Sequence, residues 1–558
     1  MKKSTLTTLL GLLFVMPFSS CEAVPSGSES SLETLASSTS ESSLEDSLST
    51  GGTASSSSSS TITVSEPKGT PDKLIFTLNT TTKAYDVSLN EETCGYGSVV
   101  IPSTYNGVPV TRIADKGFRC ERGPYAVYIP KSIMKIGDDA FTYSGTFLER
   151  IDVSPDNLYY SSCNGMLLNK DQTELIRCPK GKNNEIKLPN TVLNLRDRSF
   201  YGCDFKNFKG LPDSLIKIGN WVFEYVKNMP SKFVIPNNVT EIGKYSLSNA
   251  SFSELILGNS LNYIGEYAFQ NCENITRLEI PSSMRTINTC AFYRCRSLND
   301  VVINPGLERI EQLAFSECTS LTRLIIPETV SYISGRAFAR SSSIEWFQVS
   351  PQNPYYCSVD DVIYNKNQTV LVSCPPRKKA VTIPYTVTSI GDYAFSYNNR
   401  ITSIVIPDRV TRVGHDAFYY CSSLQEVTIG KSVTLLDQYS FYECEALETV
   451  NIQSKVLEEI DNNSFHHCVS LAIIKIPDSV ERIGGFAFQD CSSLQEVGLG
   501  SGVSRIDICA FADTDALECF YYAGSMSDWA SISKGSQIFG GSSLTSISCS
   551  DGDVNVNA

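Results

Sequence analysis

Apolar residues return at a fixed period of about 23 residues along most of this chain. A large apolar anchor marks each unit: Phe118, Phe141, Phe200, Phe223, Leu247, Phe269, Phe292, Phe315, Phe338, Phe395, Phe418, Phe441, Phe465, Phe488 and Phe511. Two steps, from Phe141 to Phe200 and from Phe338 to Phe395, are longer and contain insertions. Self-similarity at one short period is the signature of a repeat architecture.

Other positions keep a fixed distance from the anchor. The stretch Leu-x-x-Val-x-Ile, as at Leu424 to Ile429, predicts a short strand with one buried face. A following proline predicts the end of that strand, because proline cannot donate to a central ladder. Val-x-x-Ile predicts a second extended segment, and Gly-Asp-x-Ala-Phe predicts a tight turn with at most one helical turn. One unit can bury its apolar side only against its neighbours, so the pattern predicts a mainly β repeat solenoid of about fifteen coils.

The consensus Leu-x-x-Val-x-Ile-Pro-x-x-Val-x-x-Ile-Gly-x-x-Ala-Phe-x-x-Cys resembles the BspA-like (Treponema pallidum-type) leucine-rich repeat, over roughly residues 74–549. The resemblance implies a leucine-rich repeat fold. For function it implies a bacterial surface protein that adheres to host proteins and cells through protein–protein binding.

Residues 1–20 are predicted to be a lipoprotein signal peptide. Their apolar run, Leu6 to Phe18, is too short to span a membrane. The sequence Phe-Ser-Ser-Cys that ends at Cys21 resembles a lipobox, which implies cleavage before Cys21 and lipidation of its thiol. The alternative is an ordinary cleaved signal and a secreted product. Residues 21–70, rich in Ser and Thr, cannot bury enough apolar surface to fold and are predicted to be a disordered tether.

The remaining boundaries follow from the repeat. Residues 71–117 are predicted to form an N-terminal cap and the first coil, and residues 118–516 the solenoid proper. Residues 517–549 are predicted to form a C-terminal cap in which Trp529 plugs the open end of the core. Residues 550–558 are predicted to be a loose tail.

The first insertion, near 154–185, and the second insertion, near 350–380, match each other at a constant offset of 196 residues. In each, a stretch such as Asn365-Lys-Asn-Gln-Thr lies between two apolar runs and predicts a hairpin turn. One interpretation is a hairpin that pads the edge of the solenoid. The other is a protruding binding element, since insertions in repeat proteins gather on one face.

The charge of the chain limits its partners. The formal net charge of −14 and the pI near 4.9 argue against non-specific binding to nucleic acid or anionic lipid. No nucleic-acid partner is therefore predicted.

Cysteines are numerous for a chain predicted to be exported: there are 19. Eight occupy one column, three residues after the anchor: Cys203, Cys272, Cys295, Cys318, Cys421, Cys444, Cys468 and Cys491. We interpret them as buried thiols that act as small apolar groups. Disulfides are the alternative, because neighbouring coils bring Cα atoms to within about 5 Å. The chain has no Cys-x-x-Cys, and no metal site or cofactor is predicted.

Catalysis finds little support in the sequence. The chain has three histidines, His415, His466 and His467, and each falls next to an anchor. No Gly-x-Ser-x-Gly, His-Glu-x-x-His or phosphate-loop motif occurs. The chain is therefore predicted not to be an enzyme.

Candidate binding residues come from the outward positions of the predicted strands. One column contains Arg277, Asp300, Arg323 and Trp346. Trp and Arg are the residue types enriched at interface hot spots. The alternative for Trp346 is that it packs under the second insertion, which begins just after it.

Two further sets of residues are expected at the surface. Tyr355 and Tyr356, at the start of the second insertion, join the candidate site. Six residues before the anchor, basic residues form an interrupted column: Arg112, Lys135, Lys217, Arg309, Arg412, Arg482 and Arg505. We interpret this column as a solvated edge rather than a track for glycans.

The sequence thus predicts a lipid-anchored protein of the cell surface that binds proteins of a host or of neighbouring cells through a concave strand face. The first alternative is a carbohydrate-binding surface protein. The second is a structural surface component without a specific ligand.

Overall fold

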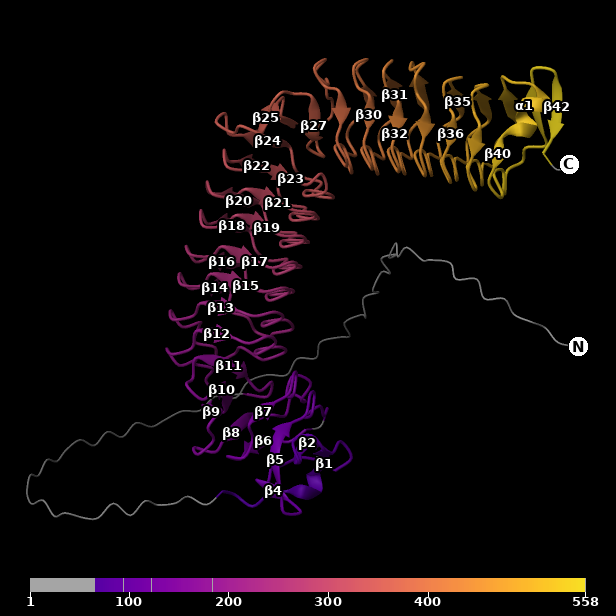
Figure 1. The fold of residues 1–558 in the computed structure, drawn as a ribbon. Helices are drawn as coiled ribbons and strands as arrows, with labels where there is room; N and C mark the ends of the chain where they lie inside the picture. Colours follow the sequence, from indigo (N-terminus) through magenta and orange to yellow (C-terminus); the bar gives the residue numbers. More distant parts are fainter. Residues whose placement is uncertain (1–65, 94, 122, 183, 557–558) are drawn as a thin grey trace, which may run out of the picture. The chain divides into compact units, whose positions relative to one another are not determined.

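The computed structural model describes residues 66–93, 95–121, 123–182 and 184–556. These residues form strands and turns, with a short 3₁₀ turn at Pro71–Lys73 and one α-helix, α1 (Met526–Ser531). The predicted mainly β solenoid is confirmed (Figure 1). The predicted signal peptide, Cys21 and nearly all of the tether lie outside the described residues and remain predictions. No helix in the described ranges has the length and apolar content needed to cross a membrane.

Most coils supply one strand of two residues and one longer strand. Around Phe418 these are β30 (Arg412–Val413) and β31 (Glu426–Ile429), as the repeat predicts. Both pair in parallel with the equivalent strands of the preceding and following coils. Stacking the coils therefore builds two ladders side by side (Figure 1).

The two-residue strands form two long ladders. The first contains β12 (Asn194–Leu195), β13 (Lys217–Ile218), β15 (Glu241–Ile242), β17 (Tyr263–Ile264), β19 (Thr286–Ile287), β21 (Arg309–Ile310) and β23 (Tyr332–Ile333). The second contains β28 (Ser389–Ile390), β30, β32 (Leu435–Leu436), β34 (Glu459–Ile460), β36 (Arg482–Ile483), β38 (Arg505–Ile506) and β40 (Ser533–Lys534).

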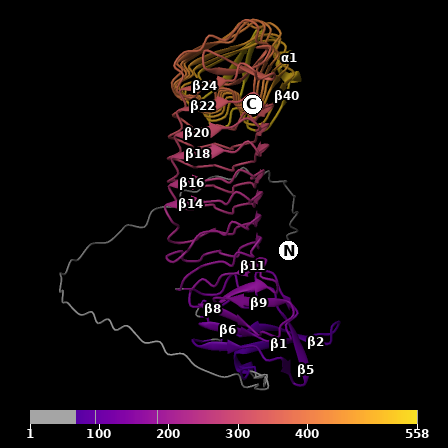
Figure 2. The same ribbon diagram turned by 90° about the vertical axis from the view of Figure 1, so that its left-hand side faces the viewer.

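The longer strands stack in the same order, as Figure 2 shows for β14 to β24. Before the second insertion they are β14 (Lys232–Val234), β16 (Glu254–Ile256), β18 (Arg277–Ile280), β20 (Asp300–Ile303), β22 (Arg323–Ile326) and β24 (Trp346–Val349). After it they are β29 (Ser403–Val405), β31, β33 (Thr449–Ile452), β35 (Ile473–Ile476), β37 (Glu496–Leu499), β39 (Cys519–Tyr522) and β41 (Ser546–Cys549).

The anchors form the centre of the core. All fifteen predicted anchors are buried, including Leu247. In most neighbouring coils the anchor rings stack: the centroids of Phe418 and Phe441 are 4.9 Å apart, and those of Phe441 and Phe465 are 5.1 Å apart. This spacing is close to the distance of about 4.8 Å between neighbouring strands, so the repeat period itself produces the stack.

The turn around each anchor is tight and not helical. Asp416 and Tyr420, two residues on either side of Phe418, have φ angles of 54° and 56°. This alternation directs the N–H groups of residues 416, 418 and 420 to carbonyl groups of the next coil, at 2.7–3.0 Å. The turns thereby satisfy their buried backbone groups between coils.

Both insertions contain the predicted hairpins, but their strands are built into the ladders of the solenoid. In the second, β25 (Tyr356–Val359), β26 (Val362–Asn365) and β27 (Val370–Ser373) form an antiparallel meander, and β27 then pairs in parallel with β28. In the first, β9 (Tyr160–Cys163), β10 (Met166–Asn169) and β11 (Glu174–Arg177) do the same, and β11 pairs with β12. The hairpin turns are as predicted, but each insertion lies in line with the ladder that follows it.

The insertions divide the interior into three hydrophobic cores. Ile363 packs in the core that precedes β26, whereas Val362 and Tyr364 pack in the core that follows it. In β10, Leu167 and Leu168 divide between two cores in the same way. Successive side chains of a strand point to opposite faces, so one strand with apolar residues throughout can close two cores. Each insertion is therefore a wall inside the solenoid.

A tyrosine of each insertion closes the ladder before it. The hydroxyl oxygen of Tyr356 accepts a hydrogen bond from the backbone N–H of Ile333 in β23, at 3.2 Å. In the first insertion, Tyr160 accepts from the N–H of Ile136 in β7 (Lys135–Ile136), at 3.0 Å. The tyrosine hydroxyl thus accepts from a backbone N–H group that has no following strand of the ladder to pair with.

The N-terminal region begins with β1 (Leu74–Asn79) and β2 (Ala84–Leu89), which pair antiparallel. β2 pairs in parallel with β5 (Val108–Ile113), which connects to the first coil through β7. The short β4 (Thr104–Tyr105) pairs with β5, and a separate ladder contains β3 (Ser98–Val100), β6 (Ala126–Ile129) and β8 (Arg150–Val153).

The C-terminal region differs from the prediction in one respect. Trp529, on α1, is buried as predicted and packs edge-on against Phe520, with centroids 5.8 Å apart. Residues 550–558 were predicted to be a loose tail, whereas Gly552–Asn555 form β42, which pairs antiparallel with β41. The alternation of Val554 and Val556 explains this, because both side chains pack against the last core.

The cysteine column combines burial with hydrogen bonding. All eight cysteines of the column are buried and free. Each thiol donates to a carbonyl oxygen of the preceding coil, as Cys444 does to Phe418 at 3.2 Å. Burial raises the pKa of Cys318 and of Cys491 to about 12, which keeps these thiols protonated. In one of the coils without this cysteine, Ser341 donates to the carbonyl oxygen of Phe315 in the same way, at 2.6 Å.

Substitution of Cys444 tests whether the thiol acts as a donor. We expect Cys444→Ser to be more stable than Cys444→Ala by about 0.5–1.5 kcal/mol, because serine retains the hydrogen bond to Phe418. Urea denaturation of the two variants measures the difference. If Cys444→Ala is equally stable or more stable, the thiol acts only as a small apolar group.

Candidate binding surface

The outward side of the longer strands is the candidate binding surface, and we call it the strand face. In β22, Leu324 and Ile326 are buried, whereas Arg323 and Ile325 are exposed. Alternation along each strand therefore leaves two outward columns across the coils.

The structure places the predicted column in register. Arg277 of β18 pairs with Asp300 of β20, and Arg323 of β22 pairs with Trp346 of β24. The Arg277 guanidinium contacts the Asp300 carboxylate and lies 3.8 Å from Glu279. Its charge is therefore compensated within the column.

Charge is compensated at Arg277 and Asp300 but not at Arg323, in the other half of the column. Arg323 is exposed and forms no ion pair with any residue that the structure describes. Trp346 beside it is half-buried. An unpaired guanidinium next to a partly open indole can contact a partner with both charge and apolar surface.

The two tyrosines of the candidate site have different environments. The side chain of Tyr355 is 52% exposed and can contact a partner. Tyr356 is half-buried, and its hydroxyl group closes the ladder at Ile333. The structure thus gives Tyr356 a structural role.

A groove lies on the strand face between β16 and β18. The longer strands before the second insertion pair only two by two, as β14–β16, β18–β20 and β22–β24, so β16 and β18 share no ladder. A cavity at this place has a volume of about 680 Å³. Its lining combines charged, polar and apolar side chains: Glu254, Ile256, Leu257, Arg277, Glu279 and Asn304.

The repeat pattern predicts that Arg277 lies on this face, but it does not reveal the groove. The groove arises where pairing between two coils fails, and pairing is not a property of a single repeat. The steps on either side of Leu247, to Phe223 and to Phe269, depart from 23 residues and are the sequence signal of irregularity at this place.

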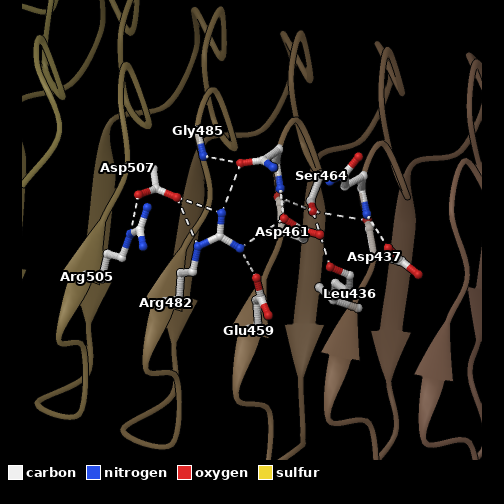
Figure 3. A network of polar contacts seen from close by, with 11 residues as sticks. Leu436, Asp437, Glu459, Asp461, Ser464, Arg482, Gly485, Arg505 and Asp507 are labelled. Atoms are coloured by element: carbon white, nitrogen blue, oxygen red, sulfur yellow. Dashed lines mark hydrogen bonds and ion pairs between the residues drawn. The ribbon is translucent and has the colours of Figure 1, made fainter.

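Six of the seven residues of the basic column form ion pairs with described carboxylates, Lys135 being the exception. Figure 3 shows the Arg482 guanidinium among Glu459, Asp461 and Asp507. Its distances to Asp461 and Asp507 are 3.1 and 2.7 Å. Burial would raise the pKa of Asp507, but hydrogen bonds from Arg505 and Arg482 outweigh it and hold this pKa low. These contacts agree with a solvated edge.

Glu317 is the centre of a second charged cluster. Its carboxylate accepts hydrogen bonds from the Tyr293 hydroxyl and the Arg294 guanidinium, both at 2.9 Å, and from Arg340 at 3.4 Å. Burial would raise the pKa of Glu317, but the hydrogen bonds from Arg294 and Tyr293 lower it. Because the folded state lowers this pKa, the carboxylate stabilises the fold above the ordinary glutamate pKa.

The Glu317→Gln variant tests this stabilisation. At pH 7 we expect it to be about 1–3 kcal/mol less stable than the natural chain. As the pH falls through the ordinary pKa of about 4.3 and then through the folded value, the carboxylate is protonated and the difference should vanish. Thermal denaturation of both proteins between pH 7 and pH 3 measures this. A difference that persists at pH 3 would contradict the ionic origin.

The structure offers no metal-binding cluster within its described ranges: no group of three His, Cys, Asp or Glu there could hold an ion. The Nε2 atom of His415 lies 2.8 Å from Asp416, and this hydrogen bond raises the pKa of His415. Burial lowers the pKa of His466. Both histidines lie in the stacked turns, as their place beside the anchors predicts.

Comparisons with known proteins agree with the repeat. A family model described as BspA type Leucine rich repeat region (6 copies) matches residues 178–249, 229–345, 373–471 and 458–556. No curated protein matches the chain.

Several solved structures of bacterial repeat proteins are similar. A leucine-rich repeat protein from Eubacterium ventriosum is 23% identical, over 70% of this chain and 94% of that chain, with a TM-score of 0.47. A leucine rich cell surface protein from Faecalibacterium prausnitzii is 21% identical, over 84% and 98%, with a TM-score of 0.41. The pneumococcal vaccine antigen PcpA is 16% identical, over 83% and 93%, with a TM-score of 0.37.

Proposed function

This chain belongs to the BspA-type leucine-rich repeat family, and from that premise we propose that it is a bacterial surface protein that binds other proteins through its strand face. The observation that carries the proposal is the open part of that face between β16 and β24. It combines the groove at Arg277 with the unpaired Arg323 beside Trp346.

The chemistry of this region suits a protein partner. Ile256 and Ile325 are 40% and 53% exposed, so the face offers apolar area among its charges. Interfaces are apolar at the centre and polar at the rim, with Trp and Arg enriched. The proposed partners are proteins of a host or of neighbouring cells.

A glycan ligand is less well supported. Sugars stack on open aromatic faces, but the rings of Trp221, Tyr245 and Tyr267 cover one another. Their centroids are 6.2 and 4.7 Å apart, and the rings are nearly parallel. The edges of such a stack offer hydrogen bonds rather than a flat platform.

The proposal includes attachment to the membrane. Lipidation of Cys21 would attach the chain to the membrane, and the Ser- and Thr-rich residues that follow would separate the attachment point from the solenoid. Metabolic labelling with a fatty-acid probe, with Cys21→Ala as the control, tests the attachment separately from binding.

Binding is tested with the full chain against extracellular-matrix proteins, mucin, a glycan array and its own cells. We expect saturable binding to a protein, and at least about tenfold weaker binding by Arg323→Ala/Trp346→Ala. The matched control is Arg409→Ala/Tyr385→Ala, an arginine–aromatic pair at 5.4 Å that lies in turns and not on the longer strands.

Three results would contradict the proposal. Binding to glycans alone would favour the carbohydrate-binding alternative. Self-association without any other saturable ligand would favour a structural role. Equal loss of binding in the two double variants would remove the site from the strand face.

A further inference from the structure

Four lysines surround a cavity beside the first insertion. The cavity has a volume of about 340 Å³. Its charged and hydroxyl-bearing lining consists of Thr146, Lys180, Lys182, Asp204, Lys206 and Lys227. The chain as a whole has a formal net charge of −14, so such a concentration of lysines runs against its average composition.

Two of the cations at this place are buried. The side chain of Lys182 donates to the carbonyl oxygen of Asn164 at 2.5 Å and forms no ion pair with a described carboxylate. Arg177, in the same insertion, donates to the carbonyl oxygens of Arg198 and Tyr201, and its Nε atom is buried without a partner among the described atoms. The Lys182 ammonium is therefore solvated by a neutral carbonyl group, whereas the nearby Asp139 carboxylate also stabilises the charge of Arg177.

The positive charge of Arg177 disfavours the charged form of Lys180. Its side chain is half-buried, and its Nζ atom lies 5.2 Å from the centre of the Tyr201 ring. Burial lowers the pKa of Lys180, and the nearby charge of Arg177 lowers it further. Like charges held together at a partly buried place favour the entry of an anion.

The second insertion shows how the same position is neutralised. Lys378 corresponds to Lys182 at the offset of 196 residues, and its Nζ atom lies 2.9 Å from Asp360 and 3.0 Å from Asp361. In the first insertion Asn164 and a glycine replace these two acids. The residues that correspond to Arg177 and Lys180 are a serine and a proline. The second insertion therefore lacks counterparts of Arg177 and Lys180, its Lys378 is ion-paired, and its Arg377 lies 3.9 Å from Glu345.

The single acid of the cavity does not cancel four lysines. Asp204 accepts hydrogen bonds from the Asn228 side chain at 2.7 Å and from the Lys206 backbone at 3.1 Å. It also lies 3.7 Å from the Lys206 ammonium group. At most one lysine is therefore compensated.

We propose that this cavity binds an oxyanion, the sulfate or phosphate ester of a small ligand, through Lys180, Lys182, Lys206 and Lys227. The ammonium groups and the Thr146 hydroxyl supply charge-assisted donors, and the cavity has room for one esterified sugar unit. The site stands apart from the strand face and does not depend on the proposed protein binding.

The test uses the full chain and four probes: inorganic sulfate, inorganic phosphate, glucose 6-sulfate and glucose 6-phosphate. Titration calorimetry at low ionic strength should show saturable binding to at least one of them, weakening as salt is added. Lys206→Gln/Lys227→Gln changes two exposed residues, so the fold is retained, and it should bind at least about tenfold more weakly. The matched control, Lys455→Gln/Lys475→Gln, removes the same charge from exposed positions elsewhere and should bind as the natural chain does.

The four probes distinguish the source of the anion. Tighter binding of a sugar ester than of its inorganic ion supports the site and identifies the ester class. The proposal is wrong if none of the probes binds saturably, or if the cavity variant and the control variant lose affinity equally.

Discussion

Replacing Phe441 with alanine is expected to lower the free energy of unfolding by about 3–5 kcal/mol. The Phe441 ring is fully buried between the rings of Phe418 and Phe465, to which it is nearly parallel. Its removal leaves a cavity on the axis of the stack. The neighbouring rings cannot close this cavity, because the backbone N–H groups of Phe418 and Phe441 are bound to the next coil at 2.7 and 2.8 Å.

Two matched variants identify the cause of that loss. Phe441→Leu should cost less than half as much, because leucine fills most of the space and Leu247 occupies the same position in another coil. Tyr385→Ala, at a side chain that is 67% exposed, should change stability by less than about 0.5 kcal/mol. Urea denaturation measures all three, and hydrogen exchange should locate the loss in the coils next to Phe441. A loss no larger than that of Tyr385→Ala would contradict the stacked core.

The anchors could be predicted from the sequence and the insertions could not, for one physical reason. The burial of an anchor such as Phe418 depends on residues of its own coil, and the next coil repeats the same pattern. Burial, strand alternation and the turn can therefore be predicted from one period. The register of Arg323 with Trp346 follows from the same phase.

Features that depend on contacts between unlike segments could not be predicted. The wall formed by β26 requires that two different cores meet on its two sides, and the run Val362 to Tyr364 does not reveal this by itself. The groove at Arg277 depends on two coils that fail to pair. The lysine cavity joins residues from three successive coils, and their charges are visible in the sequence whereas their convergence is not.

The basic column also shows why contacts between coils could not be predicted from the sequence. Arg482 is visible as one member of a basic column, but its carboxylate partners come from the preceding and following coils. A count of positive charges along one column therefore overstates the free charge. Only a residue such as Arg323, without a partner among the described residues, keeps its charge for a ligand.

The buried amide of Asn353 escaped sequence analysis altogether, and its loss should be as damaging as the loss of an anchor. Asn353 opens the second insertion and is fully buried. Its Nδ2 group donates to the carbonyl oxygens of Pro327 at 2.8 Å and Val330 at 2.9 Å. Its Oδ1 atom accepts from the backbone N–H groups of Tyr355 and Tyr356, both at 2.8 Å. One side chain thus joins the wall to the preceding coil.

Asn353→Leu is therefore expected to lower the free energy of unfolding by about 3–5 kcal/mol, although leucine has a similar shape and is apolar. The reason is that two backbone N–H groups would lose their acceptor inside the protein and two carbonyl groups would each lose a donor. Hydrogen exchange should show lost protection in β25 to β27 and unchanged protection in β9 to β11, where Asn157 makes the equivalent four contacts. Asn157→Leu should give the reverse pattern.

Ser350→Ala, which removes an exposed contact to Gln352 in the same turn, should cost less than about 0.5 kcal/mol. If Asn353→Leu were as stable as Ser350→Ala, the walls would be held by apolar packing alone and the amide contacts would be incidental.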